Sequence, residues 1–476
     1  MSSMNRRQFL TQLGQGALGM LGAMLLPRLA WARAGASERP PLNVLFIICD
    51  DLGGHDPACY GNPFNETPCL DQLAREGMRF TDAYGAGPIC TPARAGCVTG
   101  RYPARLHMTQ NPGYCNPANT RLLGPVIRHE LPLEEPTFAD ALKGVGDTTG
   151  IIGKWHLGNE GFTPDKHGFD TGSFLGLHYA QAGDYFSPYI SPQHFPTDIP
   201  PGPPGEYLTD RLTNEAINYV TAHRDHPFML YLGHYAPHTS IGNRLQGKPE
   251  LNAKYREKAK HQKPPGKIDY ASMIDNLDEN IGRLLTRLRE LHLDERTVVI
   301  FTADHGAYGY ATSNAPFRAA KSTLYEGGLR IPLIIRWPGV VAPGSVCHEP
   351  VCSVDYYPTI LDIAGATDRP NHTLDGASLL PLLQQTGTFH RDALYWHKPH
   401  YDDGGAPCGA IRAGDDKLLE FFEDNRLELY NLKDDLSETH NLAATLPEKA
   451  RALQRKLAQW RQSVGAEMPV PNPNYA

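Results

Sequence analysis

The sequence predicts an α/β protein with a large, mostly parallel sheet flanked by helices. Three apolar, β-branched runs, at residues 43–48, 228–232 and 297–301, are typical of strands buried on both faces of a parallel sheet. Between the last two, residues 270–291 carry apolar side chains at helical spacing with charged side chains opposite. Strands that alternate with amphipathic helices are the pattern of an α/β core. A further apolar run at residues 333–335 is expected to add another strand.

The C-terminal part of the chain has a different pattern. Short segments at residues 409–412 and 417–420 suggest a small antiparallel sheet, and an amphipathic helix is expected from about 447 to 464. We therefore expect a main domain over residues 35–385 and a smaller C-terminal subdomain over residues 386–476.

Residues 1–34 are expected to be a twin-arginine signal peptide. Arg6 and Arg7 precede a glycine-containing apolar stretch at residues 13–26, and small-x-small cleavage sites follow it. That stretch is too short for a stable membrane span, which needs about 20 apolar residues. An uncleaved anchor is the alternative. The signal predicts a twin-arginine translocase as partner, export of the folded protein to the periplasm or medium, and no stable membrane insertion.

The net charge of the chain bears on whether it binds nucleic acid, and its cysteines bear on whether it forms a disulfide. The formal net charge of −7 becomes −11 when the four arginines of residues 1–34 are removed, because that segment has no acidic residue. Nucleic-acid binding depends on positive charge, so no nucleic-acid partner is expected. Cysteines number nine. Cys347 and Cys352 are the candidates for a disulfide, although a protein that folds in a reducing cytosol needs none.

Acidic side chains follow two of the predicted strands. Asp50 and Asp51 come directly after the first strand, and Asp304 and His305 come after another. Ligands bind at the carboxyl ends of strands in α/β sheets, where carboxylates brought together would repel one another. A hard divalent cation such as Ca²⁺ or Mg²⁺ would neutralise that repulsion. Taken alone, paired aspartates after a strand are also compatible with a turn and helix cap.

A short motif, Cys90-Thr-Pro-Ala-Arg94, precedes Thr-Gly-Arg101 and is expected to begin a helix. Pro92 suits the first helical turn, and a helix N-terminus favours an anion. A thiolate is a soft ligand and a poor match for a hard cation in an oxygen cage. The alternative is an inert thiol at a helix start.

Several further cationic side chains accompany these motifs. In an extended segment, Lys154 and His156 would face one side and Trp155 the other, which would aim two donors at one tetrahedral anion. His238 follows a strand, and Lys321 lies in a segment with several small residues. The alternatives are solvated surface lysines and a structural histidine.

These separated motifs, taken together, resemble the type I, formylglycine-dependent sulfatases, with arylsulfatase A-like members, of the alkaline phosphatase superfamily. The resemblance runs from residue 43 to about residue 441 and includes six motifs in the family's order. Ala93 stands where the family usually has serine. The resemblance implies an alkaline phosphatase-like fold, and it makes residues 35–385 a catalytic sulfatase domain.

The resemblance also implies roles for individual residues. A formylglycine-generating maturation enzyme would oxidise Cys90 to formylglycine, whose hydrate attacks the sulfur of a sulfate ester. Lys154 and Lys321 would bind sulfate oxygens, His156 would assist at the formylglycine hydroxyl, and His238 would protonate the departing alcohol. The implied catalytic positions are Cys90, Arg94, Lys154, His156, His238 and Lys321. The implied ligands of one Ca²⁺ are Asp50, Asp51, Cys90, Asp304 and His305.

The alcohol half of the substrate is less constrained by these motifs. Loops at residues 177–179 and 397–401, with Arg412, are expected to form its pocket, and they suit a sulfated carbohydrate such as a galactose or N-acetylgalactosamine sulfate. A phosphate or phosphonate mono- or diesterase of the same superfamily is the first alternative. A non-enzymatic protein that binds sulfated glycans is the second.

Overall fold

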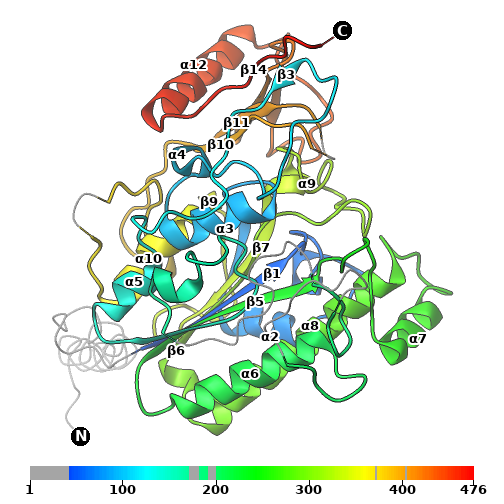
Figure 1. Ribbon diagram of the computed structural model, residues 1–476, viewed down its shortest axis with the longest axis vertical. Helices are drawn as coiled ribbons and strands as arrows, with labels where there is room; N and C mark the ends of the chain where they lie inside the picture. Colours follow the sequence, from blue (N-terminus) through cyan, green and yellow to red (C-terminus); the bar gives the residue numbers. More distant parts are fainter. Residues whose placement is uncertain (1–41, 171–181, 191–199, 370–371, 403–404, 476) are drawn as a thin grey trace, which may run out of the picture.

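The computed structural model describes the chain apart from residues 1–41, 171–181, 191–199, 370–371, 403–404 and 476 (Figure 1). The predicted signal peptide and the predicted pocket loop at residues 177–179 therefore lie outside the described residues. Within the described part, no helix is both long enough and apolar enough to cross a membrane.

One large sheet forms the centre of the described structure. It has eight strands, and the four at one side, β4, β5, β1 and β6, are mutually parallel. In spatial order the strands are β4 (Thr148–Gly153), β5 (Phe228–Pro237), β1 (Asn43–Asp50), β6 (Thr297–Ala303), β7 (Arg330–Arg336), β2 (Met78–Tyr84) and β8 (Ser345–Cys347), with β9 (Val351–Cys352) also paired to β2. The predicted strands are all present. The run near residue 333, however, forms β7, which is antiparallel to both of its neighbours.

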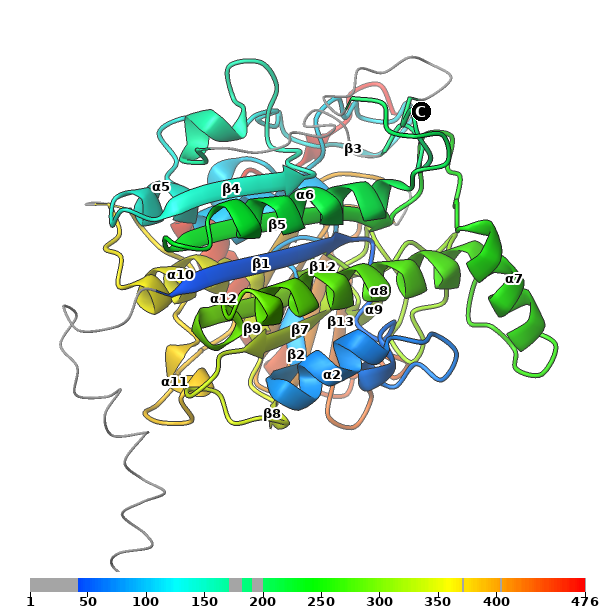
Figure 2. The ribbon, with the colours of Figure 1, turned by 90° about the horizontal axis from the view of Figure 1, so that it is seen from below.

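Helices cover both faces of this sheet. Helices α2 (Pro68–Glu76), α6 (Leu208–Ala222) and α8 (Ile268–Glu290) lie on one face, and α3 (Cys90–Thr99), α5 (Phe138–Lys143) and α10 (Tyr356–Ala364) lie on the other (Figures 1 and 2). Helix α8 shows why: Leu277, Ile281 and Leu284 form one buried stripe at helical spacing. Further helices are α4 (Pro103–Leu106), α7 (Pro249–Lys258), α9 (Glu326–Leu329) and α11 (Leu380–Leu383). The single-turn 3-10 helices are η1 (Ala58–Tyr60), η2 (Pro164–His167), η3 (Asp294–Arg296) and η4 (Ser353–Asp355).

A second, antiparallel sheet lies at the C-terminal end, as predicted. Its strands are β10 (Leu394–Lys398), β11 (Cys408–Ala413), β12 (Asp416–Phe421) and β13 (Leu427–Asn431), and α12 (Pro447–Ser463) packs against them. A small two-stranded sheet joins β3 (Leu122–Leu123) to β14 (Val470–Pro471). The α/β class and the small C-terminal sheet are therefore confirmed. The domain boundary at residue 386 stays a prediction.

The candidate disulfide between Cys347 and Cys352 is not formed, because both cysteines are free. The sheet register gives the reason. Cys347 pairs with Phe80 of β2, whereas Cys352 pairs with Tyr84, four residues further along the same strand. Four residues of strand span about 13 Å, whereas the Cα atoms of a disulfide lie within about 7 Å.

A buried ion-pair cluster joins the two sheets. The ammonium of Lys417 on β12 lies 2.8 Å from Glu326 Oε1 of α9 and 3.0 Å from Glu438 Oε1, and all three side chains are fully buried. Glu326 also accepts a hydrogen bond from the hydroxyl of Tyr84 at 2.8 Å. The C-terminal subdomain is thus attached to the segment that leads from residue 321 into β7.

Replacing Lys417 with methionine is expected to lower the free energy of unfolding by about 3–5 kcal/mol, because the buried carboxylates of Glu326 and Glu438 both lose an ion-pair partner, with Arg330 remaining 3.4 Å from Glu326. The measurement is denaturant-induced unfolding followed by fluorescence. Lys449→Met is the matched control, since the side chain of Lys449 is 45% exposed and pairs with Asp416. That control should cost less than about 1 kcal/mol. Equal effects of the two substitutions would contradict the assignment of a buried cluster.

Candidate active site

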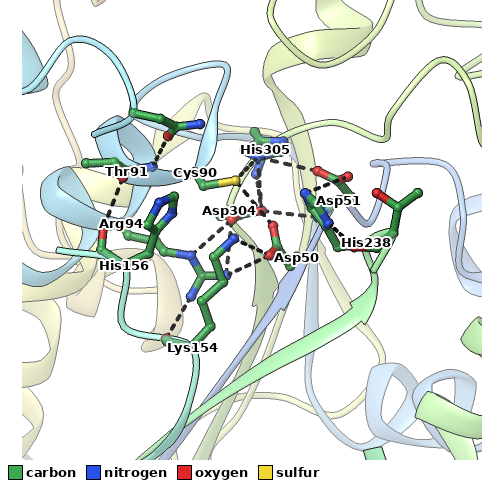
Figure 3. Close-up of polar contacts among 12 residues, drawn as sticks. Asp50, Asp51, Cys90, Thr91, Arg94, Lys154, His156, His238, Asp304 and His305 are labelled. Carbon is green, nitrogen blue, oxygen red and sulfur yellow. Dashed lines mark hydrogen bonds and ion pairs between the residues drawn. The ribbon is translucent and has the colours of Figure 1, made fainter. Parts of the chain in front are cut away.

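The predicted site residues converge at the carboxyl ends of the parallel strands (Figure 3). Asp50 is the last residue of β1, and Asp304 follows β6 directly. These two strands pair in parallel, and the Asp304 amide donates a hydrogen bond to the Cys49 carbonyl at 3.1 Å. Cys90, the first residue of α3, points into the same space.

The acidic cluster is compact and buried. Ligand atoms of Asp50, Cys90, Asp304 and His305 lie within 4.8 Å of one another, and Asp51 belongs to an overlapping group with Asp50 and Cys90. The Asp51 amide donates to Asp304 Oδ1 at 3.4 Å, and Asp51 Oδ2 is buried without any hydrogen-bond donor. Hard carboxylate oxygens, one of them unsatisfied, fit a Ca²⁺ or Mg²⁺ ion.

His305 is oriented so that its Nε2 faces the carboxylates. Its Nδ1 lies 2.9 Å from the Gly306 carbonyl, and its Nε2 lies 3.6 Å from both Asp51 Oδ1 and Asp304 Oδ1. Burial lowers the pKa of His305, but Asp304 and Cys90 outweigh burial and raise it to about 9. A cation among the carboxylates would take over that positive charge and leave Nε2 free to act as a ligand.

Cys90 lies between the acidic cluster and several cations. Its Sγ lies 3.5 Å from Asp50 Oδ1, 3.4 Å from His305 Nε2 and 3.8 Å from Lys321 Nζ. Burial alone would raise the pKa of its thiol, but Lys154, Lys321 and His305 outweigh burial and lower the pKa well below the usual value. The position is therefore built to stabilise negative charge, which an inert buried thiol would not require.

Arg94 lies one helical turn after Cys90 and is fully buried. Its Nε donates to Asp304 Oδ2 at 3.1 Å, and its Nη2 lies 4.0 Å from Asp50 Oδ2. Its Nη1 contacts the hydroxyl of Tyr231 at 3.1 Å. Arg94 thus connects the cysteine helix to the carboxylates. Tyr231 was missed, because an aromatic residue in a buried strand has the sequence pattern of an ordinary core residue.

Lys154 and His156 both reach the site. The ammonium of Lys154 bonds to Asp50 Oδ2, and the ring of His156 interacts with the Cys90 thiol. Trp155 points away and packs against Phe169, with ring centroids 5.9 Å apart. The backbone is not the expected extended segment, since β4 ends at Gly153 and His156 has a φ of +59°. A left-handed turn thus produces the arrangement that we expected from a strand.

His238 and Lys321 also lie beside the carboxylate cluster. His238 Nδ1 lies 2.7 Å from the Thr239 carbonyl, which directs Nε2 towards Lys321 Nζ at 3.0 Å and Asp51 Oδ2 at 3.4 Å. Lys321 Nζ donates to Asp51 Oδ1 at 2.6 Å. Burial disfavours the charged lysine, but Asp51 and Cys90 outweigh it and raise its pKa. Lys321 is therefore not a solvated surface lysine.

A cavity of about 550 Å³ opens beside Cys90, His238 and Lys321. Of the expected pocket segments, residues 177–179 lie outside the described residues, and residues 397–401 and Arg412 are not among the described residues that line the cavity. His400 contacts the Thr109 hydroxyl at 2.9 Å, and Arg412 donates to Asp82 at 2.7 Å. The predictions for residues 397–401 and Arg412 are therefore wrong for this cavity, because the His400 ring contacts the loop that carries Thr109 and the Arg412 guanidinium reaches Asp82 of β2.

Hydrogen bonds made by Tyr270 and Gly53 hold the segment from Asp51 to Asp56 in place. The Tyr270 hydroxyl lies 2.7 Å from the Asp51 carbonyl and 2.6 Å from Asp56 Oδ2, and the Gly53 amide donates to Asp56 at 2.7 Å. Asp51 has a φ of +63°, a conformation that costs free energy for a residue with a side chain. The Tyr270 contact helps to hold Asp51 in that conformation.

The buried carboxyl of Asp56 predicts a pH-dependent stability. Burial raises its pKa from 3.8 to about 7. The folded protein therefore keeps the proton that the unfolded chain loses, so stability falls as pH rises from about 4 to about 7. Asp56→Asn mimics the protonated form and should gain stability over wild type across that interval, by up to about 4 kcal/mol. Denaturant unfolding across the interval measures the difference. Asp225→Asn is the control, because the side chain of Asp225 is 76% exposed. Its difference from wild type in the free energy of unfolding should not change with pH.

Comparison with known proteins gives consistent results from residue 42 to residue 463. The model of the sulfatase family matches residues 42–366, and the model named for the C-terminal part of N-sulphoglucosamine sulphohydrolase matches residues 319–463. Human arylsulfatase A is 35% identical over 91% of this chain and 90% of its own length. Human N-acetylgalactosamine-6-sulfatase is 33% identical over 76% of this chain and 70% of its own length.

Solved structures give the same result for the fold. The crystal structure of Ps i-CgsB is 30% identical, with a TM-score of 0.75 over 89% of this chain and 93% of that one. The same protein has been solved in complex with k-i-k-neocarrahexaose. Phosphonate monoester hydrolase SpPMH from Silicibacter pomeroyi, at 19% identity and a TM-score of 0.64, shares the fold. The predicted alkaline phosphatase-like fold class is thereby confirmed.

Proposed function

Because the chain belongs to the sulfatase family and is a sulfuric ester hydrolase, we propose that it desulfates a carbohydrate, with a galactose or N-acetylgalactosamine sulfate as the substrate. The products are the free alcohol and inorganic sulfate. Two similarities support a saccharide as the substrate. One is the sequence similarity to the relative named N-acetylgalactosamine-6-sulfatase, and the other is the structural similarity to the protein solved with a neocarrahexaose.

One observation carries the proposal. Cys90 lies at the point where a carboxylate cluster meets a ring of cations, 3.5 Å from Asp50 and 3.8 Å from Lys321. Asp50, Asp51, Asp304 and His305 would hold the divalent cation, Ca²⁺, which neutralises their charge and polarises the sulfate group. Formylglycine at position 90 would supply, as its hydrate, a hydroxyl nucleophile and a second hydroxyl for release of sulfate.

Cations of the chain itself bind and orient the sulfate end. Lys154, Lys321 and Arg94 are buried or nearly so, and electrostatic attraction is strong where water is excluded. Their fixed positions stabilise charge that develops on the transferring group without any rearrangement during the reaction. These residues would therefore bind the tetrahedral, singly charged sulfate group of the ester beside position 90.

Two histidines are placed to move protons. His238 Nε2 faces the cavity because Nδ1 is engaged with the Thr239 carbonyl at 2.7 Å, so it can protonate the departing alcohol oxygen. Burial lowers the pKa of His156 to about 4, which leaves its ring neutral and able to accept a proton at position 90. The two histidines therefore have separate proposed roles: His238 donates a proton to the departing alcohol, and His156 accepts one at position 90.

The test combines mass spectrometry with a substrate panel. Protein co-produced with a formylglycine-generating enzyme should yield a tryptic peptide that carries an aldehyde at position 90 in place of the thiol. The same preparation should hydrolyse 4-nitrophenyl sulfate faster than 4-nitrophenyl phosphate or a phenylphosphonate ester. A free thiol in fully active protein, or faster turnover of the phosphonate, would contradict the proposal and favour the esterase alternative.

Maturation and export complete the proposal. The twin-arginine pattern at Arg6 and Arg7 supports transport of the folded, already modified enzyme to the periplasm or the medium. Fractionation of cells that produce the full chain, with Arg6 and Arg7 replaced by lysine as the comparison, tests the location. Loss of export in that variant is the expected result.

A further inference from the structure

The cavity beside Cys90 has a neutral, partly aromatic lining. Apart from the catalytic positions Cys90, His238 and Lys321, its described lining residues are tyrosines, asparagines, threonines, a serine, glycine and alanines. None of these carries a charge at neutral pH. The sulfate end of the cavity is therefore strongly charged, while the part left for the alcohol offers amide, hydroxyl and aromatic groups.

We propose that this part of the cavity binds a neutral, hydroxylated sugar ring against Tyr308 and Tyr310, and that these two tyrosines determine the specificity for the alcohol. This inference rests on the proposed sulfatase function. It predicts selection for neutral sugars and against a ring that carries a carboxylate, such as a uronic acid.

The two tyrosines form an aromatic surface at the mouth of the cavity. Their ring centroids lie 5.8 Å apart, with an angle of 38° between the ring planes. Tyr310 is 50% exposed, one of a few large apolar side chains in the described structure that face solvent to this extent. An exposed aromatic ring that also lines a pocket is typical of a ligand contact rather than a core residue.

The position of Tyr308 relative to the sulfate site sets which sugar it would contact. Lys321 Nζ, which faces the sulfate position, lies 5.8 Å from the Tyr308 ring centroid. A sugar whose sulfated oxygen lies beside Cys90 would therefore place its own ring next to Tyr308. Tyr310, further out, would contact the far side of that ring or the next sugar of a chain.

Backbone contacts hold this surface in place. The Ala311 amide donates to the Tyr308 carbonyl at 2.8 Å, and the Lys267 amide donates to the Ala311 carbonyl at 2.8 Å. The Lys267 ammonium lies 2.9 Å from the centroid of the Tyr310 ring, a cation–π contact that covers one ring face. Because the segment is braced on both sides, the tyrosines are preorganised and a ligand would lose little free energy in ordering them.

The absence of charge in the described lining argues against an acidic sugar. A carboxylate on a sugar ring beside Tyr308 would lose hydration without gaining an ion pair from the described lining, since the proposed function assigns Lys321 to the sulfate group and the Lys267 ammonium lies against the Tyr310 ring. Sugar hydroxyls, in contrast, can bond to the amides of Asn111 and Asn243 and to neighbouring hydroxyls. Arg412, which would have suited a carboxylate, lies outside the cavity.

A substrate panel tests the preference. Matured enzyme is assayed with galactose 6-sulfate, N-acetylgalactosamine 6-sulfate, glucuronic acid 2-sulfate and 4-nitrophenyl sulfate. The inference predicts a kcat/KM for at least one neutral sugar sulfate that exceeds the uronic acid value by at least about tenfold. Equal or better use of the uronic acid would overturn it. No activity on any of the four, aryl sulfate included, would instead overturn the proposed function.

Variants test the tyrosines themselves. Tyr310→Ala should raise KM for the neutral sugar sulfate by about tenfold with kcat nearly unchanged, whereas Tyr310→Phe should retain KM. Tyr308→Ala should show the same pattern more strongly. Tyr475→Ala is the matched control, because Tyr475 is also exposed, at 44%, and does not line the cavity.

Inhibition by inorganic sulfate distinguishes the loss of a sugar contact from a change at the sulfate site. Sulfate ion needs only the charged end of the cavity, so its inhibition constant should be the same in wild type and in both alanine variants. An unchanged KM in Tyr310→Ala would overturn the inference. A sulfate inhibition constant that rises in parallel with KM would also overturn it, since the substitution would then act through the sulfate site.

Discussion

Replacing Cys90 with alanine is expected to lower kcat for 4-nitrophenyl sulfate by about 10⁴- to 10⁶-fold, the loss that follows removal of a nucleophile that works as one unit with its neighbours. Cys90 is the group on which the site converges, with Asp50, His305 and Lys321 all within 3.8 Å of its sulfur. Alanine removes the nucleophile and leaves the charged surroundings in place, so little substrate turnover should remain.

The matched control is Cys97→Ala in the same helix. Cys97 is equally buried, but burial raises the pKa of its thiol above the ordinary range, and it belongs to the hydrophobic core. This substitution should change stability slightly and leave kcat within about threefold of wild type. Steady-state kinetics measures the effect, and circular dichroism with thermal unfolding shows that both variants fold. Full activity in Cys90→Ala would overturn the mechanism.

The second large effect is expected at the cation site. Asp304→Asn should weaken Ca²⁺ binding by at least about tenfold to 100-fold and lower kcat by about 10³-fold. Asp304 connects several parts of the site: it accepts from Arg94 Nε at 3.1 Å, from the Asp51 amide at 3.4 Å and from the His305 amide at 3.0 Å. The amide keeps an oxygen but loses the charge that both Arg94 and a cation need.

Calorimetric titration of chelator-treated protein with CaCl₂, and separately with MgCl₂, measures the affinity without depending on activity. Asp278→Asn is the matched control, because Asp278 is also buried, accepts hydrogen bonds from the Cys69 and Leu70 amides at 2.9 and 2.8 Å, and belongs to neither candidate metal-binding group. This control should bind Ca²⁺ as wild type does. Wild-type Ca²⁺ affinity in Asp304→Asn would remove Asp304 from the ligand set.

Much of the fold could be read from local patterns. The runs that form β1, β5 and β6 are apolar throughout because both faces of a parallel sheet are covered, and this leaves a clear signal. The carboxyl ends of parallel strands meet at one edge, so Asp50 and Asp304 could be placed together before any coordinates were known. The C-terminal strands and α12 followed from the same kind of periodicity.

Other features depend on contacts between segments that are distant in sequence. The direction of β7 is a property of its pairing with β6 and β2, and an apolar run looks the same in either direction. Cys347 and Cys352 are close in the chain, yet the register of β2 separates them. Neither the strand direction nor the register is encoded in the local spacing of residues.

For this protein, motif and periodicity were sufficient to predict the α/β class, the sulfatase family and the charged end of the site, because those depend on residue type and on strand ends. Only the three-dimensional packing placed Arg412 between the sheets, brought Tyr231 against Arg94 and set Tyr308 and Tyr310 at the cavity. The physical reason is that the side chains that line the cavity come largely from loops, whose positions follow from long-range contacts and not from local pattern.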